Sequence, residues 1–184
     1  MKSPNLTVAA ILICASAPFA AGQASAQLSN GSSPSSQLDG FVGDGICTGT
    51  MPAMGKSPAR ASTGKFHGEK ILDGQWAVIH YDEDRTEAVP KPFSVVQYIG
   101  YDPAAKHFVT VLFENTGGSY TTGVSSGMKG NTMTFDESTL MDGKRVQARD
   151  VFANGEGGMS THTGLMRDDS GKWIAMDKET CHKA

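Results

Sequence analysis

The sequence predicts an all-β protein, an antiparallel up-and-down β-barrel of about ten strands. Segments rich in β-branched and aromatic residues recur roughly every 10–14 residues and are joined by short corners. Gly, Asp, Asn and Ser dominate these corners, and beyond residue 61 no helical periodicity remains. Closure into a barrel would remove the unpaired edges of such a meander, and a ten-strand sandwich is the main alternative.

The first residues predict an exported protein. Lys2 precedes an apolar run over residues 6–20, and Ala24-Ser25-Ala26 supplies small residues at a cleavage site. This is the three-part pattern of a secretory signal peptide, so we expect residues 1–26 to be cleaved after Ala26 and the mature chain to be periplasmic or secreted. The alternative, a membrane anchor, would need roughly 20 apolar residues.

A polar linker and a short helical turn are predicted before the first strand. Residues 27–36 are rich in Ser, Asn, Gly and Pro, which is typical of a flexible linker. Leu38, Phe41 and Val42 then share one helical face, which predicts a turn at the start of a single barrel domain over residues 37–184.

The strands are predicted from alternation between corners. Asp73-Gly74 favours a hairpin corner with positive φ, and Asp102-Pro103 supplies another in which the Asp102 side chain bonds to the backbone two residues on. The predicted strands are 46–51, 63–71, 75–84, 93–101, 107–113, 119–124, 131–136, 145–152, 159–167 and 173–176, the last continuing towards residue 181.

The cysteines predict a disulfide in the folded domain. Removal of the signal peptide would remove Cys14 and leave Cys47 and Cys181, one near each end. In an oxidising compartment such an isolated pair most simply forms a structural bridge. A redox or metal-binding pair is the alternative, but no CxxC spacing is present.

Charge and hydropathy argue against a nucleic acid partner and against a membrane span. The net charge is −3 and there is no basic run, so we expect no nucleic acid partner. No apolar stretch after the signal peptide approaches spanning length, so we expect no membrane span in the mature chain.

Several segments together carry a family resemblance. They are LDGFVGDG (38–45), LDGQW (72–76), YIGYDPAAKHF (98–108), SSGMKG (125–130) and the closing KWIAMDKETCHK (172–183). With them the chain resembles bacterial exported proteins of unknown function with a lipocalin-like, or calycin-type, barrel. The resemblance implies a fold and leaves function open, because such barrels host many roles.

Metal and cofactor chemistry is weakly indicated. The histidines form no short metal motif, although His80 with His107 or His162 could converge as haem or metal ligands if they faced inward. The nine methionines would suit Cu(I), but they are scattered and are better explained as core packing. We therefore expect no metal and no cofactor.

The preferred hypothesis is a barrel that binds one small, largely apolar molecule. The candidate cavity residues, with His80 and Arg149 as polar anchors, are Trp76, His80, Tyr98, Phe113, Phe135, Arg149 and Trp173. The alternatives are a filled-barrel envelope protein and, less favoured, a cofactor-free isomerase or cyclase. No catalytic constellation is recognisable: GxSxG is missing, and Asp150, between Arg149 and Val151, is better explained by a salt bridge or a barrel-end contact than as a general acid or base.

Overall fold

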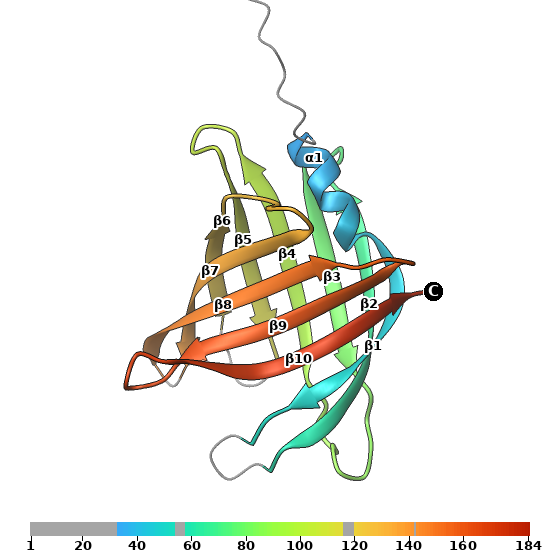
Figure 1. Ribbon diagram of the computed structural model, residues 1–184, viewed down its shortest axis with the longest axis vertical. Helices are drawn as coiled ribbons and strands as arrows, with labels where there is room; N and C mark the ends of the chain where they lie inside the picture. Colours follow the sequence, from blue (N-terminus) through green and yellow to red (C-terminus); the bar gives the residue numbers. More distant parts are fainter. Residues whose placement is uncertain (1–32, 54–57, 116–119, 142) are drawn as a thin grey trace, which may run out of the picture. The chain divides into compact units, whose positions relative to one another are not determined.

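Ten antiparallel strands form one closed barrel in the computed structural model, which describes residues 33–53, 58–115, 120–141 and 143–184 (Figure 1). Each strand pairs with its neighbours in sequence, and β1 also pairs with β10, which closes the barrel. The predicted up-and-down barrel is therefore confirmed, and the sandwich alternative is excluded. The elements are α1 (Pro34–Gln37), η1 (Leu38–Phe41), β1 (Gly43–Met51), β2 (Arg60–Ile71), β3 (Trp76–Glu83), β4 (Ser94–Asp102), β5 (His107–Glu114), β6 (Tyr120–Ser125), β7 (Thr132–Met141), β8 (Lys144–Asn154), β9 (Met159–Arg167) and β10 (Trp173–Lys183).

The strands agree with the predicted ranges except near their ends, and β7 differs most. It continues past the predicted end at Asp136 as far as Met141. The predicted corners also form. Asp73 has a φ of 56° in the β2–β3 corner, and the Asp102 carboxylate accepts a hydrogen bond of 2.8 Å from the Ala104 amide.

A disulfide joins the two strands that close the barrel. Cys47 of β1 and Cys181 of β10 are direct partners in the strand register, and their sulfurs are bonded. The predicted Cys47–Cys181 bridge is therefore confirmed. It connects the first strand to the last across 134 positions of sequence, at the point where the meander closes on itself.

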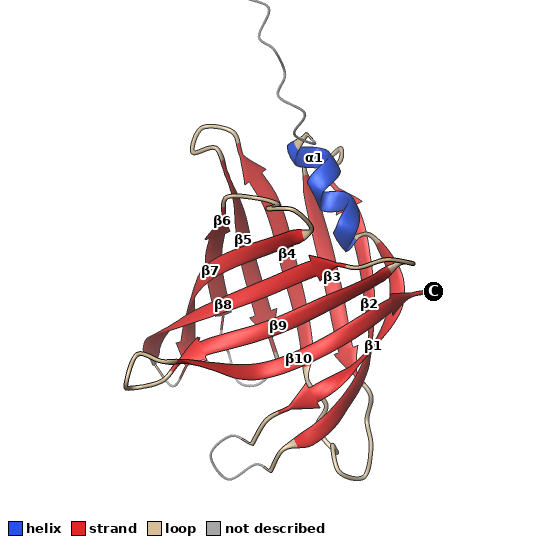
Figure 2. Cartoon of the chain, viewed as in Figure 1, coloured by secondary structure: helices blue, strands red, loops and turns tan. Residues whose placement is uncertain are grey.

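The helical segment lies at one end of the barrel (Figures 1 and 2). Pro34 occupies the first turn of α1, and the Ser33 hydroxyl accepts a hydrogen bond from the Ser36 amide, so a favourable cap begins the helix inside the predicted linker. η1 then inserts Leu38, which is fully buried. The predicted apolar helical turn is thus present and starts earlier than expected; residues 1–32, which include the predicted signal peptide, lie outside the described residues.

The main apolar core lies inside the barrel beneath this segment. Its fully or almost fully buried members come from η1, β3, β4, β5 and β7, and they are Leu38, Ala77, Ile99, Phe108, Met133 and Phe135. Phe41 and Phe152 pack against this cluster with their rings edge to face, 5.1 Å apart. Alternation along each strand therefore places these residues inside and their sequence neighbours on the outer face.

Candidate functional site

A cavity of about 270 Å³ lies inside the barrel, next to the apolar core. Most of its wall is apolar, and five aromatic rings contribute to it: Phe41, Phe66, Tyr81, Phe93 and Phe152. Enclosed, mainly apolar spaces with a few polar groups are the usual form of small-molecule sites. The cavity is therefore the candidate site.

The charged groups of the cavity wall are mostly acidic, and uncharged polar side chains such as Gln97, Thr121 and Ser160 lie among them. Five carboxyl side chains line it, and they are Glu114, Glu137, Asp150, Asp177 and Glu179. The only basic side chain among the described lining residues is His162. Arg60 lies near this region but pairs with the buried Glu83 carboxylate, whose pKa that ion pair lowers against the effect of burial.

His162 of β9 bridges two of these carboxylates. Its Nε2 atom is 3.3 Å from Asp150 Oδ1 on β8, and its Nδ1 atom is 3.0 Å from Asp177 Oδ1 on β10. Burial alone would lower the pKa of His162, but the two negative charges and their hydrogen bonds outweigh it and raise the pKa well above 6.5. The imidazole is therefore an imidazolium at neutral pH, held between two aspartates.

The backbone makes room for this arrangement at Gly164. A Cβ atom at Gly164 would meet the Asp177 carboxylate, and the Gly164 amide donates a hydrogen bond of 3.1 Å to Asp177 Oδ1. Burial would raise the pKa of Asp177, but the charge of His162 and these hydrogen bonds lower it. A β-bulge between Ala175 and Asp177 adjusts the phase of β10 at this point.

Glu137 of β7 has the opposite electrostatic environment. Burial, followed by the charge of Asp150, raises the pKa of Glu137 to about 9. Its Oε1 atom is buried without a hydrogen-bond partner among the described residues, although the side chain lines the cavity. At neutral pH Glu137 is therefore a neutral carboxylic acid that faces the cavity.

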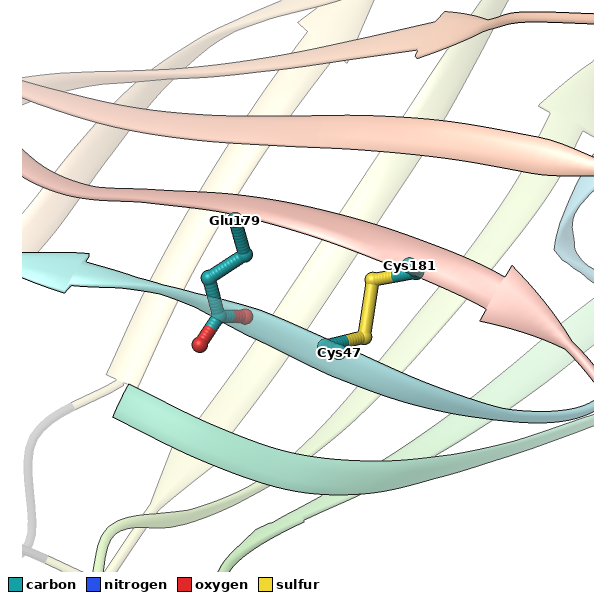
Figure 3. Close-up of side chains that lie close together, drawn as sticks. All are labelled: Cys47, Glu179 and Cys181. Atoms are coloured by element: carbon teal, nitrogen blue, oxygen red, sulfur yellow. A yellow bond between two sulfur atoms is a disulfide. The ribbon is translucent and has the colours of Figure 1, made fainter. Parts of the chain in front are cut away.

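Glu179 occupies the part of the cavity next to the disulfide (Figure 3). Its Oε1 atom accepts hydrogen bonds from the Ser62 hydroxyl at 2.8 Å and the Tyr81 hydroxyl at 2.7 Å. Burial raises the pKa of Tyr81, so the phenol remains a donor. Cys47, Glu179 and Cys181 bring potential metal-ligand atoms within 4.8 Å of one another, but both sulfurs are used in the disulfide and no thiolate is left to bind a metal.

Comparison with known proteins places the chain in a family. The family model described as "Protein of unknown function (DUF1579)" matches residues 32–182. The chain belongs to this family. No curated protein sequence matches it.

A solved structure supports the fold of this DUF1579 protein. It is similar to the crystal structure of Rv2717c from M. tuberculosis, with a TM-score of 0.63 and 14% sequence identity, over 83% of this chain and 98% of that one. At this identity the likeness concerns the fold alone. Within the described residues no helix is long and apolar enough to cross a membrane.

None of the seven cavity residues predicted from the sequence lines the cavity of this DUF1579 barrel. Phe135 faces inward but is fully buried in the apolar core. The other six lie on the outer face, and they are Trp76, His80, Tyr98, Phe113, Arg149 and Trp173. For four of them, His80, Tyr98, Phe113 and Arg149, a neighbour in the strand lines the cavity instead.

The outer positions of the two tryptophans have clear structural reasons. The Trp76 ring covers Gly100, its partner on β4, where a Cβ atom would collide with it. The Trp173 ring packs against the Arg149 and Arg167 guanidinium groups, at 4.7 and 4.9 Å from the ring centroid. Because the bulge in β10 reverses the alternation, Trp173 faces outward while Asp177 faces inward.

The convergence of histidines, which the sequence offered only as a less favoured alternative, does not occur at this cavity. Of His80, His107 and His162, only His162 lines the cavity. Both of its ring nitrogens are engaged by aspartates, so the imidazole offers no free lone pair to haem iron or copper. Sequence reasoning expected a salt bridge or barrel-end contact at Asp150, which pairs with His162 while Arg149 pairs with Asp136. It missed Glu137, although Met133 and Phe135 face inward on the same strand and alternation extended by two residues would have found it.

Proposed function

We propose that this DUF1579 protein is an exported, calycin-type barrel that binds one small, largely apolar molecule in its interior. The observation that carries the proposal is the cavity of about 270 Å³, with a mainly apolar wall and the Glu137 Oε1 atom, which has no hydrogen-bond partner among the described residues. A barrel filled by its own side chains would leave no such space, and a buried carboxyl group without a partner costs about 1–3 kcal/mol. A bound molecule that hydrogen-bonds to Glu137 would offset this cost.

We further propose that residues 1–26 are a signal peptide removed after Ala26, and that a short linker precedes the barrel domain. The start of the family match at residue 32 and of α1 at Pro34 suggest that the linker is shorter than residues 27–36. The Cys47–Cys181 disulfide supports an oxidising compartment such as the periplasm or the extracellular space.

Native mass spectrometry of the protein, purified without refolding from cells that export it, tests both proposals. We expect the intact chain to begin at Gln27, to lack two hydrogen masses because of the disulfide, and to carry an additional non-covalent mass of a small molecule. Ala148→Leu, at a cavity-lining position of β8, should displace this mass by filling space. Ala61→Leu, the same change at an exposed position of β2, should retain it.

Two results would contradict these proposals separately. A chain that still begins at Met1 after export would reject the signal peptide. A barrel without a small-molecule ligand would carry no retained mass. Its melting temperature would be the same in cell extract as in buffer, for the wild type and for Ala148→Leu alike.

A further inference from the structure

The charge balance of the cavity wall points to the kind of molecule it holds. Five carboxyl side chains line the cavity, and His162, already shared by Asp150 and Asp177, is the one basic side chain among the described lining residues. An anion placed there would meet several negative charges and no guanidinium or ammonium group. A cation would be attracted, and more strongly than in water because Glu137, Asp150 and Glu179 are buried.

Resting on the proposed function, we propose that the ligand is an organic cation: an apolar body carrying one protonated amine that binds between Glu137 and Asp150. These residues come from neighbouring strands, and both are buried, with 8% and 9% of their surface exposed. Glu137 has one carboxyl oxygen without a partner among the described residues, and an ammonium group supplies three donors.

The groups around Glu137 on every adjoining strand support this assignment. β8 contributes Asp150 and β9 contributes His162, while Asp136 of β7 faces outward and pairs with Arg149. On β6 the residue opposite Glu137 is Gly123, so no charged side chain covers it from that side. Beyond His162, Asp177 completes the set, and two aspartates against one imidazolium leave a net negative charge beside Glu137.

The aromatic part of the wall fits the same ligand. The Phe152 ring lies 4.8 Å from the His162 ring and packs against Phe41, so apolar surface continues directly from the acidic group. Aromatic faces attract cations as well as apolar groups. An amine attached to an aromatic or aliphatic body can therefore place its charge on the carboxyl groups and its body on the rings.

This arrangement couples binding to proton release. Free Glu137 is protonated at neutral pH because its pKa is raised to about 9. An ammonium group beside it would favour the carboxylate and lower that pKa, so the complex should release up to about one proton per ligand near neutral pH. A ligand held only by apolar contacts would release none.

Three compounds of one shape test the inference: phenethylamine, phenethyl alcohol and phenylacetate, which are cationic, neutral and anionic. Binding is measured by calorimetry near neutral pH in two buffers with different ionisation enthalpies, which reports proton release. We expect phenethylamine to bind about tenfold or more tightly than the alcohol, as a charge-assisted hydrogen bond allows, and phenylacetate to bind least. Glu137→Gln should remove both the preference and the proton release, while Glu156→Gln, at an exposed corner, should leave them unchanged.

The outcomes separate this inference from the proposed function. Equal or tighter binding of the alcohol or of phenylacetate would overturn the cation and leave the binding cavity standing. A preference for the amine that persists in Glu137→Gln would overturn the assignment to Glu137. No binding of any of the three compounds would count against the cavity as a binding site and therefore against both proposals.

Discussion

The barrel interior contains two adjoining regions, an apolar core and an acidic cavity, that differ in what they contribute. In the core, side chains such as Leu38, Phe108 and Phe135 are completely or almost completely buried, and each large apolar side chain contributes about 1.5–3 kcal/mol. In the cavity, carboxyl groups are buried beside one another, which costs free energy unless each is paired. The core therefore stabilises the barrel, and the cavity retains groups that stability alone does not explain.

The largest effect should come from opening the core. Phe135→Ala should destabilise the protein by about 3–5 kcal/mol, because it leaves a space in a fully packed cluster. Phe113→Ala is the matched control on the outer face, where the ring is 51% exposed, and should cost less than about 1 kcal/mol. Urea denaturation of both variants gives the comparison, and similar losses would contradict the assignment of inner and outer faces.

The next effect concerns the seam between β1 and β10. Replacing Cys47 and Cys181 by Ser should lower the unfolding free energy by about 2–4 kcal/mol, because the disulfide closes a loop of 134 positions in the unfolded chain. The wild-type protein under a reducing agent should unfold at the same urea concentration as the double variant. A variant as stable as the oxidised protein would show that the strand pairing alone closes the barrel.

A smaller effect should distinguish the cavity from the core by its dependence on pH. The pKa of Glu137 is about 9 in the folded protein against 4.5 for an ordinary Glu, so the folded state holds the proton more tightly. The stability that this tighter proton binding gives the folded state is complete below about pH 4.5. It is lost as the pH rises towards 9. Glu137→Gln, which cannot ionise, should therefore gain stability relative to wild type as the pH increases.

Between pH 5 and pH 8 we expect this gain to reach about 1–2 kcal/mol. Linkage limits it to about 1.4 kcal/mol per pH unit, or about 4 kcal/mol over this range. Thermal or urea unfolding at several pH values measures it. Glu156→Gln, at an exposed position, should follow the wild-type curve. A parallel pH dependence in wild type and Glu137→Gln would mean that Glu137 is ionised in the folded protein.

The strands and corners could be predicted from the sequence, whereas the inner face and the cavity could not, because the two depend on different kinds of information. The strands and corners follow from local alternation and turn residues, such as Asp73-Gly74. The inner face does not follow from them. On β3 both faces are apolar. Trp76 lies outside, over its cross-strand partner Gly100, and that pairing is known only from the strand register.

The acidic site required information that is even less local. His162 joins Asp150 and Asp177 from three successive strands, and the bulge in β10 defeats simple alternation at Asp177. Glu137 was accessible in principle, since Met133 and Phe135 mark the inner face of β7. The residues that follow Phe135 are polar, and they predict a strand end at Asp136. Glu137, on which the proposed ligand depends, lies just beyond that predicted end.

The smallest effect compares two adjacent residues of β8 that face opposite sides of the barrel wall. Arg149 lies outside, where it pairs with Asp136 and stacks on Trp173, and Arg149→Ala should cost less than about 1 kcal/mol. The main measurable effect of Arg149→Ala should be a change in the fluorescence of Trp173.

Asp150 lies inside, and Asp150→Asn should weaken the binding of phenethylamine because it removes a negative charge beside Glu137. The outer surface near Arg149 and Trp173 is itself concave, so the pair of variants also decides which side of the wall holds the ligand. If Arg149→Ala weakens amine binding and Asp150→Asn does not, the ligand binds on the outer face and the interior carboxyl groups have another role.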